Sequence, residues 1–176
     1  MDKIIFTYRL THDTGFAPCV DNGLLTLACC KGGTKTVNRG LRYFIGRFFE
    51  ENLQKNVEVY ISGIYEGKLL YIAKIDKVIT MNEYFDKKEY KDRIDRIYRL
   101  DGVKLKRDKR KLKGIHNDEH SNLCDINGKY VLILFVKHDF FTPYIHLENE
   151  KNYMIYKRSG NGKRVVGYQE IKNMFN

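Results

Sequence analysis

Two short segments in the N-terminal half carry the side chains best suited to chemistry. In the loop 11–18, His12 and Asp13 place an imidazole beside a carboxylate, and further along Cys30 ends an apolar stretch. A histidine titrates near neutrality and can transfer protons, while a thiol becomes a nucleophile when a base or a positive charge lies nearby. Because His12 or Lys31 can supply that base or charge, the candidate catalytic residues are His12, Asp13 and Cys30.

The same residues are also compatible with purely structural roles. Asp13 and Thr14 favour local hydrogen bonds that stabilise a loop, and Phe16 can fill the hydrophobic core. Cysteines with apolar neighbours, such as Cys29 and Cys30, are usually buried core residues. Composition alone therefore favours the structural interpretation of this region.

Metal-binding and cofactor-binding patterns are weak in this chain. His12, Cys19, Cys29 and Cys30 lack the paired C-x-x-C or H-x-x-x-H spacing of zinc sites. Adjacent cysteines on a strand also point to opposite faces. Phosphate-loop and dinucleotide-binding motifs are absent. We therefore predict neither a metal ion nor a cofactor.

A second polar cluster lies later in the chain and consists of His116, Asn117, His120 and Cys124. Loops on a rigid scaffold often carry functional sites. Two histidines four positions apart share a metal only when they lie on a helix, and the composition of this stretch indicates a loop. We therefore expect these residues in a solvated loop.

The positive charge of the chain is large and clustered. Lysine and arginine total 32 against 22 acidic residues, which gives a net charge of +10. Such a surplus favours a polyanionic partner, nucleic acid or a nucleotide, because basic side chains on phosphates release counterions. Solubility, or the codon bias of an AT-rich genome, is the alternative explanation. The candidate phosphate contacts lie mainly in the basic run 104–113 and the basic turn 157–164: Lys35, Lys104, Lys106, Arg107, Arg110, Lys111, Lys157, Arg158, Lys163 and Arg164.

Other features indicate a cytoplasmic protein of one domain, residues 1–176. No stretch reaches the ~18–20 apolar residues of a membrane span, and the N-terminus lacks the features of a secretory signal. We therefore expect no membrane partner, and we expect the four cysteines as free thiols, since disulfides need an oxidising compartment. The length fits one domain with a full hydrophobic core. The oligomeric state is not indicated.

The elements that must position these side chains are short strands and helices. Residue alternation predicts a hairpin of strands 57–65 and 68–79. Thr80 and Glu83 form a capping box, which predicts a helix from Met81. Further strands are predicted at 4–10, 23–30, 129–136, 153–156 and 165–168, and further helices at 41–53 and 169–175. The fold class is therefore α+β.

Several segments resemble the nucleotide modification associated domain, type two. Residues 8–18, which contain HDTGFAP, and residues 25–31, which end in CCK, carry the resemblance. It continues through 59–63, 70–75, 81–85 and 127–133, so it covers residues 5–140. The central pattern also resembles EVE and ASCH domains of the PUA-like class. This implies a PUA-like mixed, mostly antiparallel β-barrel with flanking short helices.

The resemblance implies a module that binds nucleic acid or a nucleotide, recognises a base or modified base, and is linked to DNA modification or phage-defence conflict. The chain contains no tryptophan, so Phe16, Tyr43 or Tyr60 would have to line the base pocket. The implied ligand-binding residues are Thr11, His12, Asp13, Thr14, Gly15, Phe16, Cys30, Lys31 and Tyr60. Two alternatives stay open. One is an enzyme that modifies nucleotides or nucleic acid through His12, Asp13 and Cys30. The other is a phage-type interaction protein that sequesters or inhibits a defence component.

Overall fold

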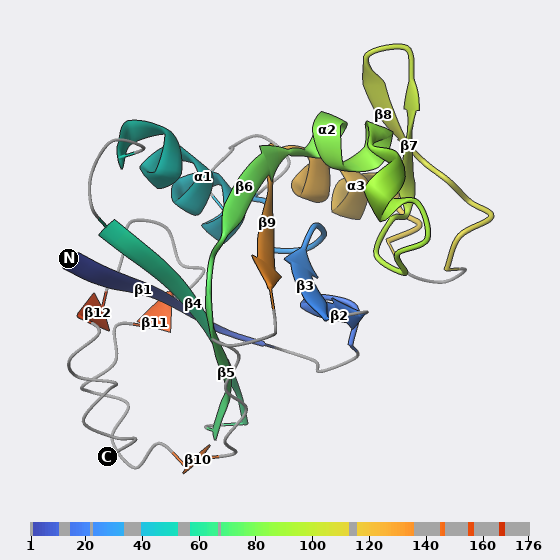
Figure 1. Cartoon of the computed structure of the whole chain (residues 1–176). Helices are drawn as coiled ribbons and strands as arrows, with labels where there is room; N and C mark the ends of the chain where they lie inside the picture. The colour runs from blue at the N-terminus through green and yellow to red at the C-terminus, as the bar shows by residue number, and fades with distance from the viewer. Residues whose placement is uncertain are drawn as a thin grey trace.

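Two β-sheets, a separate two-stranded ribbon and short helices organise the chain, which confirms the α+β class (Figure 1). The structure is a computed structural model of the 176-residue chain. It describes residues 2–10, 15–21, 23–33, 40–52, 57–66, 68–112, 116–135, 145–146, 155–156 and 166–167.

The first sheet is built around the predicted hairpin. β4 (Val57–Tyr65) and β5 (Lys68–Lys74) pair antiparallel, as the residue alternation predicts. β1 (Asp2–Arg9) lies parallel to β4 along its whole length. Three two-residue strands of the C-terminal part complete this sheet: β10 (Ile145–His146), β11 (Ile155–Tyr156) and β12 (Val166–Gly167). β11 and β12 lie within the strands predicted at 153–156 and 165–168, whereas the predicted helix 169–175 lies outside the described residues.

The second sheet is antiparallel throughout and has the strand order β2-β3-β9-β6. Its strands are β2 (Cys19–Asp21), β3 (Leu24–Leu27), β6 (Lys77–Thr80) and β9 (Tyr130–Phe135). The predicted strand 68–79 is therefore two strands, β5 and β6, in different sheets. The chain changes sheets at residues 75–76, where the Ile75 N–H donates to Val59 of the first sheet (2.8 Å) and the Asp76 N–H donates to Ile133 of the second (3.0 Å). No closed barrel is found among the described residues, and the PUA-like barrel is not confirmed.

The helices lie along the second sheet and beside it. The predicted helix 41–53 is confirmed as α1 (Leu41–Asn52), which packs on β9 and β6. The capping box at the start of α2 (Met81–Asp86) is also confirmed, since Thr80 and Glu83 each accept a hydrogen bond from the backbone N–H of the other. The 3-10 helix η1 (Lys88–Tyr90) follows α2.

Residues 98–126 contain the largest departure from the predicted elements. The expected solvated loop at 116–124 is wrong for most of its length, because α3 (Glu119–Ile126) begins there, capped by Asp118, whose side chain accepts from the Ser121 N–H. Before it, β7 (Tyr98–Asp101) and β8 (Lys104–Arg107) form an antiparallel ribbon, and the basic run 104–113 begins on its second strand.

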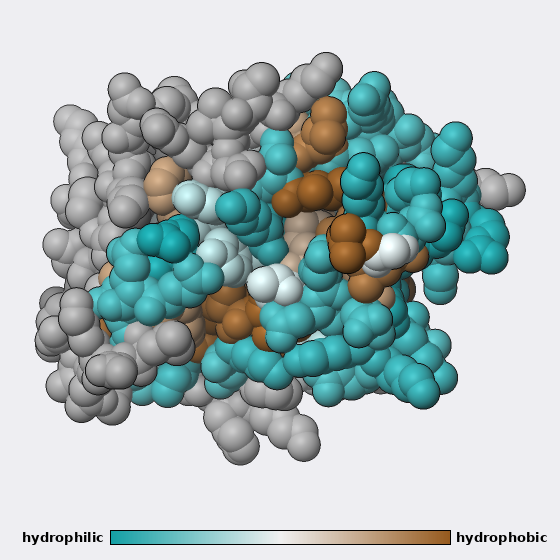
Figure 2. Space-filling view, turned by 90° about the horizontal axis from the view of Figure 1, so that it is seen from above, coloured by the Kyte–Doolittle hydropathy of each residue, from teal (hydrophilic) through white to brown (hydrophobic). Residues whose placement is uncertain are grey.

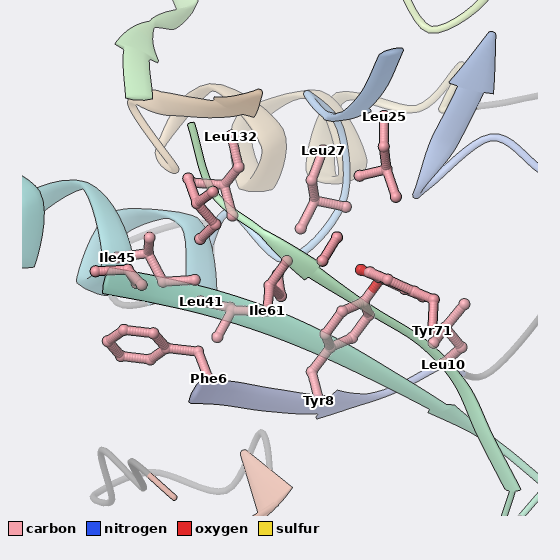
Figure 3. Close-up of a cluster of buried hydrophobic side chains, with 13 residues drawn as sticks. Phe6, Tyr8, Leu10, Leu25, Leu27, Leu41, Ile45, Ile61, Tyr71 and Leu132 are labelled. Atoms are coloured by element: carbon pink, nitrogen blue, oxygen red, sulfur yellow. The ribbon is translucent and has the colours of Figure 1, made fainter. Parts of the chain in front are cut away.

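The hydrophobic core fills the space between the two sheets (Figure 3). Phe6 and Tyr8 of β1 lie there with Leu27 of β3 and Leu41 of α1. A second buried cluster lies on the other face of the second sheet, because alternate residues of a strand point to opposite faces. That cluster includes Phe16 and Cys29, so the half-buried Cys30 lies at its edge.

Two further expectations concern thiols and membranes. All four cysteines are free, as predicted. Within the described ranges, the structure contains no helix long and apolar enough to cross a membrane.

Candidate functional site

Cys30 lies in a tight bend shortly after β3. Its neighbour Cys29 is fully buried, and the Cys29 thiol donates to the backbone oxygen of Asp95 at 3.5 Å. Cys30 and Lys31 both have left-handed backbone conformations, with φ of 58° and 51°. Such conformations are uncommon outside glycine, so surrounding contacts must hold the bend. The bend turns the half-buried Cys30 side chain toward His116.

Arg42, near the start of α1, anchors this bend. Its side chain is fully buried, and its guanidinium donates to the backbone oxygens of Cys30 (2.7 Å), Asp125 (2.6 Å) and Tyr130 (2.5 Å). The Arg42 backbone N–H donates to the Lys31 oxygen at 3.1 Å. A buried cation needs such acceptors because its desolvation is costly. Arg42 thereby joins the bend to α3 and β9.

Glycines allow the backbone to pack closely around Arg42. A Cβ atom on Gly32 would lie 2.2 Å from the backbone oxygen of Cys124 and 2.6 Å from the Arg42 Nη2 atom. A Cβ atom on Gly128 would lie 2.6 Å from the Gly32 Cα atom. Larger residues at these positions would therefore displace the Cys30 bend.

Asp125, on α3, is the hydrogen-bonding centre of the site. Its carboxylate is buried, and Oδ1 accepts from the backbone N–H of Cys30 at 2.6 Å. Oδ2 accepts from the Tyr98 hydroxyl at 2.8 Å and from Nδ1 of His116 at 2.5 Å. These three donors compensate for the burial of the carboxylate and fix its orientation.

His116 connects Asp125 to Cys30. Because Nδ1 faces Asp125, the other ring nitrogen, Nε2, lies 3.3 Å from Sγ of Cys30. The ring packs edge-to-face against Phe16, with centroids 5.7 Å apart. Burial lowers the pKa of His116, but its hydrogen bonds to Asp125 and Cys30 outweigh burial and raise the pKa to about 10. The ring is therefore an imidazolium at neutral pH.

The order thiol, imidazole, carboxylate is that of enzymes with a cysteine nucleophile. An imidazolium beside the sulfur stabilises the thiolate, which is the reactive form of cysteine. Asp125 keeps Nε2 directed at the sulfur and stabilises the charge of the ring. Of the four cysteines, Cys30 alone is not buried. The arrangement can therefore perform nucleophilic chemistry at Cys30.

The same three residues, Cys30, His116 and Asp125, are also the group of potential metal ligands that the described part of the chain offers. Their ligand atoms all lie within 4.8 Å of one another. Both Asp125 oxygens, however, already accept hydrogen bonds from protein donors. A metal ion would have the Cys30 sulfur and the His116 Nε2 atom as ligands, whereas zinc sites use three or four protein ligands. The donor set therefore fits a nucleophile better than a metal centre.

Part of the predicted ligand-binding site lies at this bend. Phe16 is buried against His116, and the preceding Gly15 is exposed. Lys31 lies at the margin, where its ammonium group donates to the backbone oxygen of Arg9 at 3.0 Å. The described residues on either side of positions 11–14 therefore contact residues of the bend and the site, Arg9 through Lys31 and Phe16 through His116.

The other predicted site residues are placed elsewhere or not described. Tyr60 is buried on β4 of the first sheet and donates to Glu58 at 3.3 Å. Tyr43 of α1 packs against Tyr130, with ring centroids 6.2 Å apart. Several residues lie outside the described ranges: Thr11, His12, Asp13, Thr14, Lys35, Lys157, Arg158, Lys163 and Arg164.

The described phosphate candidates belong to two groups. Lys104, Lys106, Arg110 and Lys111 are exposed. Arg107 is half-buried, and its guanidinium donates to five backbone oxygens, those of Ile97, Asp108, Lys111, Leu112 and His116. Arg107 therefore closes the turn after β8 and ties it to the site histidine.

Sequence reasoning identified Cys30 and Phe16 but missed their partners. His116 appeared only in a cluster assigned to a loop, and Asp125 was not singled out. The Asp118 side chain accepts from the backbone N–H three residues on, a helix cap whose pattern is visible in the sequence and would have indicated α3. No pattern in the sequence connects His116 to Cys30.

Comparison with known proteins agrees with the sequence resemblance. The family model described as nucleotide modification associated domain 2 matches residues 2–134. This range contains Cys30, His116 and Asp125. Searches of the curated proteins and of the solved structures find no match to this chain.

Proposed function

Because the chain belongs to the nucleotide modification associated domain 2 family, we propose that it is a thiol-dependent enzyme that acts on a nucleotide or on a base in nucleic acid. Cys30 is the nucleophile, His116 the proton donor and acceptor, and Asp125 the residue that orients the histidine. One observation carries this proposal: Nε2 of His116 lies 3.3 Å from the Cys30 sulfur, while Nδ1 is held by Asp125 at 2.5 Å.

The chemistry follows from the charge distribution of the site. The Cys30 thiolate attacks an electrophilic carbon of the substrate, and a sulfur–carbon bond forms. The electron pair displaced from that carbon moves to the adjacent atom of the substrate, which takes the proton from Nε2 of His116. His116 is left neutral and can accept a proton when the covalent intermediate breaks down. Asp125 accepts from Nδ1 throughout and keeps the ring in the required tautomer.

Recognition of the base belongs to the loop between residues 10 and 15 in this proposal. His12 and Asp13 would hydrogen-bond the base or sugar edge, and Thr11 and Thr14 would line the same wall. The support is that Arg9 and Phe16, which are described on either side of these positions, contact Lys31 and His116 respectively.

A binding module without catalysis is the alternative, as is an interaction protein of phage conflict. Recognition of a base or a protein requires no nucleophile with an oriented imidazolium, so the geometry at Cys30 favours an enzyme. The link to DNA modification and phage defence is part of the proposal and rests on the family. A reactive thiol also fits a reducing compartment such as the cytoplasm.

The test is turnover combined with covalent trapping. The protein is incubated with ordinary and modified nucleotides, single-stranded DNA and duplex DNA, and products are separated by liquid chromatography and mass spectrometry. We expect a product that Cys30→Ala and His116→Ala abolish, and an adduct at Cys30 in intact mass. Equal binding of nucleotides by wild type and Cys30→Ala, without any product from the whole panel, would support the binding module instead.

A further inference from the structure

The β7–β8 ribbon begins at the candidate active site. Tyr98, the first residue of β7, donates its hydroxyl to the Asp125 carboxylate at 2.8 Å. Arg107, the last residue of β8, lies opposite Tyr98 in the ribbon and donates from Nε to the His116 backbone oxygen at 3.3 Å. Both strands of the ribbon are thus fixed at one end to the residues that orient the Cys30 thiol.

The two faces of the ribbon differ in chemistry. Residues that pair directly across the strands share a face, so Leu100 and Leu105 lie on one face with Tyr98 and Arg107. These four residues are buried or half-buried. The other face carries Arg99, Asp101, Lys104 and Lys106, all of them exposed. The ribbon therefore presents a mainly cationic face to solvent.

The charge continues into the turn after β8. Residues 98–112 contain seven basic and two acidic residues, a net charge of +5. The two acids are paired, Asp101 with Lys106 and Asp108 with Arg110. Lys104, Lys109 and Lys111 are exposed and form no ion pair within the described part of the chain. These three lysines and the exposed Arg99 are the cations most available to an anionic partner.

The shape of the ribbon suits an extended polyanion. The ribbon projects from the body of the protein beside α2 and α3 (Figure 1). Seen from above, the described surface is mostly hydrophilic, with a few hydrophobic patches (Figure 2). Val103, in the turn at the tip, is 83% exposed, and the Asn82 side chain donates to its backbone oxygen at 3.4 Å. A four-residue strand spans about 13 Å, about four nucleotides of a duplex strand, and a two-stranded ribbon fits the DNA major groove.

From these observations we propose that the substrate base is part of a polynucleotide, whose phosphates lie along the outer face of the β7–β8 ribbon and the turn that follows β8. This inference takes one point from the proposed function, which is the nucleophilic chemistry at Cys30. A free nucleotide carries its phosphates in one short chain and gains little from lysines spread along the ribbon and the following turn. A polynucleotide contacts several of them at once and places one of its bases at the root of the ribbon, beside the thiol.

The test measures polynucleotide binding without relying on catalysis. Fluorescence anisotropy gives the Kd of the full chain for labelled single-stranded DNA, duplex DNA and RNA of the same sequence over a salt series. The ribbon variant is Lys104→Gln, Lys109→Gln and Lys111→Gln. The matched control removes three exposed lysines elsewhere, as Lys77→Gln, Lys88→Gln and Lys91→Gln, so both proteins lose the same charge.

We expect the ribbon variant to bind on the order of 10-fold more weakly and its salt slope to fall by about 2 to 3, since each phosphate contact contributes about 0.7 to 0.9. The control should change both quantities much less. The three nucleic acids identify which polynucleotide is preferred. Equal losses in the two variants, or binding to none of the three nucleic acids, would overturn the inference. An intact Cys30 activity on free nucleotides alone would overturn it while leaving the proposed function standing. Binding of a polynucleotide through the ribbon without any Cys30 chemistry would support the binding inference and overturn the proposed function.

Discussion

The Cys30 sulfur and the His116 Nε2 atom lie 3.3 Å apart, although 86 positions separate the two residues in the chain. The approach depends on two backbone distortions, since both residues have left-handed φ values, 58° and 47°. Strain of this kind persists only where surrounding contacts hold it, and it is concentrated at functional sites. Arg42 and Asp125 supply those contacts on the Cys30 side, and Arg107 supplies one on the His116 side.

The first prediction concerns the reactivity of the four thiols. Iodoacetamide near neutral pH should modify Cys30 first, because the other three cysteines are buried. Burial also raises the pKa of Cys29 well above its ordinary value, and that thiol should stay unmodified in the folded protein. His116→Ala should slow the modification of Cys30 about 10-fold or more, because the imidazolium is removed. Peptide mapping by mass spectrometry measures both effects, and equal rates in wild type and variant would contradict an activated thiol.

A second prediction separates the charge of Asp125 from the hydrogen bond of Tyr98. Asp125→Asn should slow alkylation of Cys30 strongly, since the amide neither carries the charge nor orients His116 as the carboxylate does. Tyr98→Phe leaves that charge in place, so the alkylation rate should change by less than about threefold, while stability falls by about 1–2 kcal/mol for a lost hydrogen bond to a charged group. Urea denaturation and alkylation kinetics on both variants give the comparison. Loss of reactivity in Tyr98→Phe as large as in Asp125→Asn would show that position, not charge, matters.

Local patterns in the sequence were sufficient for much of the fold. The β4–β5 hairpin, α1 and the Thr80–Glu83 capping box depend on neighbours in the chain, and each is confirmed. The sheet change at residues 75–76 was not predictable, because Lys74, Ile75 and Asp76 alternate between polar and apolar as a continuing strand does. The hydrogen bonds of Ile75 and Asp76 go to partners that only the folded chain brings near. The barrel was expected from the PUA-like resemblance, whereas the described strands form separate sheets.

In the site, too, neighbouring residues were predictable from the sequence, whereas contacts between residues far apart in the chain were not. The residue type of Cys30 and the adjacent Lys31 distinguish it in the sequence, where the nearest histidine is His12, a residue outside the described ranges. The histidine found beside Cys30 is His116, held by a carboxylate on α3. Residues so far apart meet through packing, which neither spacing nor periodicity encodes.

A third prediction tests the anchor of the Cys30 bend. Arg42→Gln should destabilise the protein by about 3–5 kcal/mol, because three backbone oxygens would lose a buried charged donor. Arg47→Gln on the same helix is the matched control. Arg47 is exposed and pairs with Glu50 and Glu51 at the surface, so its loss should leave the urea midpoint nearly unchanged. Similar midpoints for the two variants would argue against Arg42 as the anchor.

A fourth prediction addresses metals. Because both Asp125 oxygens are occupied by protein donors, treatment of the protein with a chelator should change neither its melting temperature nor the alkylation rate of Cys30. Added zinc should bind weakly, since two ligands do not make a zinc site. Calorimetric titration with zinc checks the affinity. Tight binding that His116→Ala and Cys30→Ala both abolish would indicate a metal centre instead of a nucleophile.

The last prediction concerns pH. His116 has an ordinary pKa of 6.5. In the folded protein burial lowers this pKa, but the hydrogen bonds to Asp125 and Cys30 raise it by more, so that it is about 10. The folded state therefore holds a proton that the unfolded chain releases between these two values. The stability that the proton contributes is fully present below pH 6.5 and is lost as the pH rises through 10. A pKa raised from 6.5 to about 10 corresponds to a contribution of about 5 kcal/mol across this window, at about 1.4 kcal/mol per pKa unit.

The measurement is the free energy of unfolding of wild type minus that of His116→Gln at a series of pH values. Subtracting the free energy of the variant cancels the contribution of lysine and tyrosine titration, because these groups titrate in both proteins. The difference should decline steadily between pH 6.5 and 10, and Cys30→Ala should make the decline smaller, because one of the two hydrogen-bond partners of the ring is gone. A difference that stays constant over this range would show that His116 is neutral in the folded protein, and Cys30 would then lack the imidazolium on which its proposed reactivity depends.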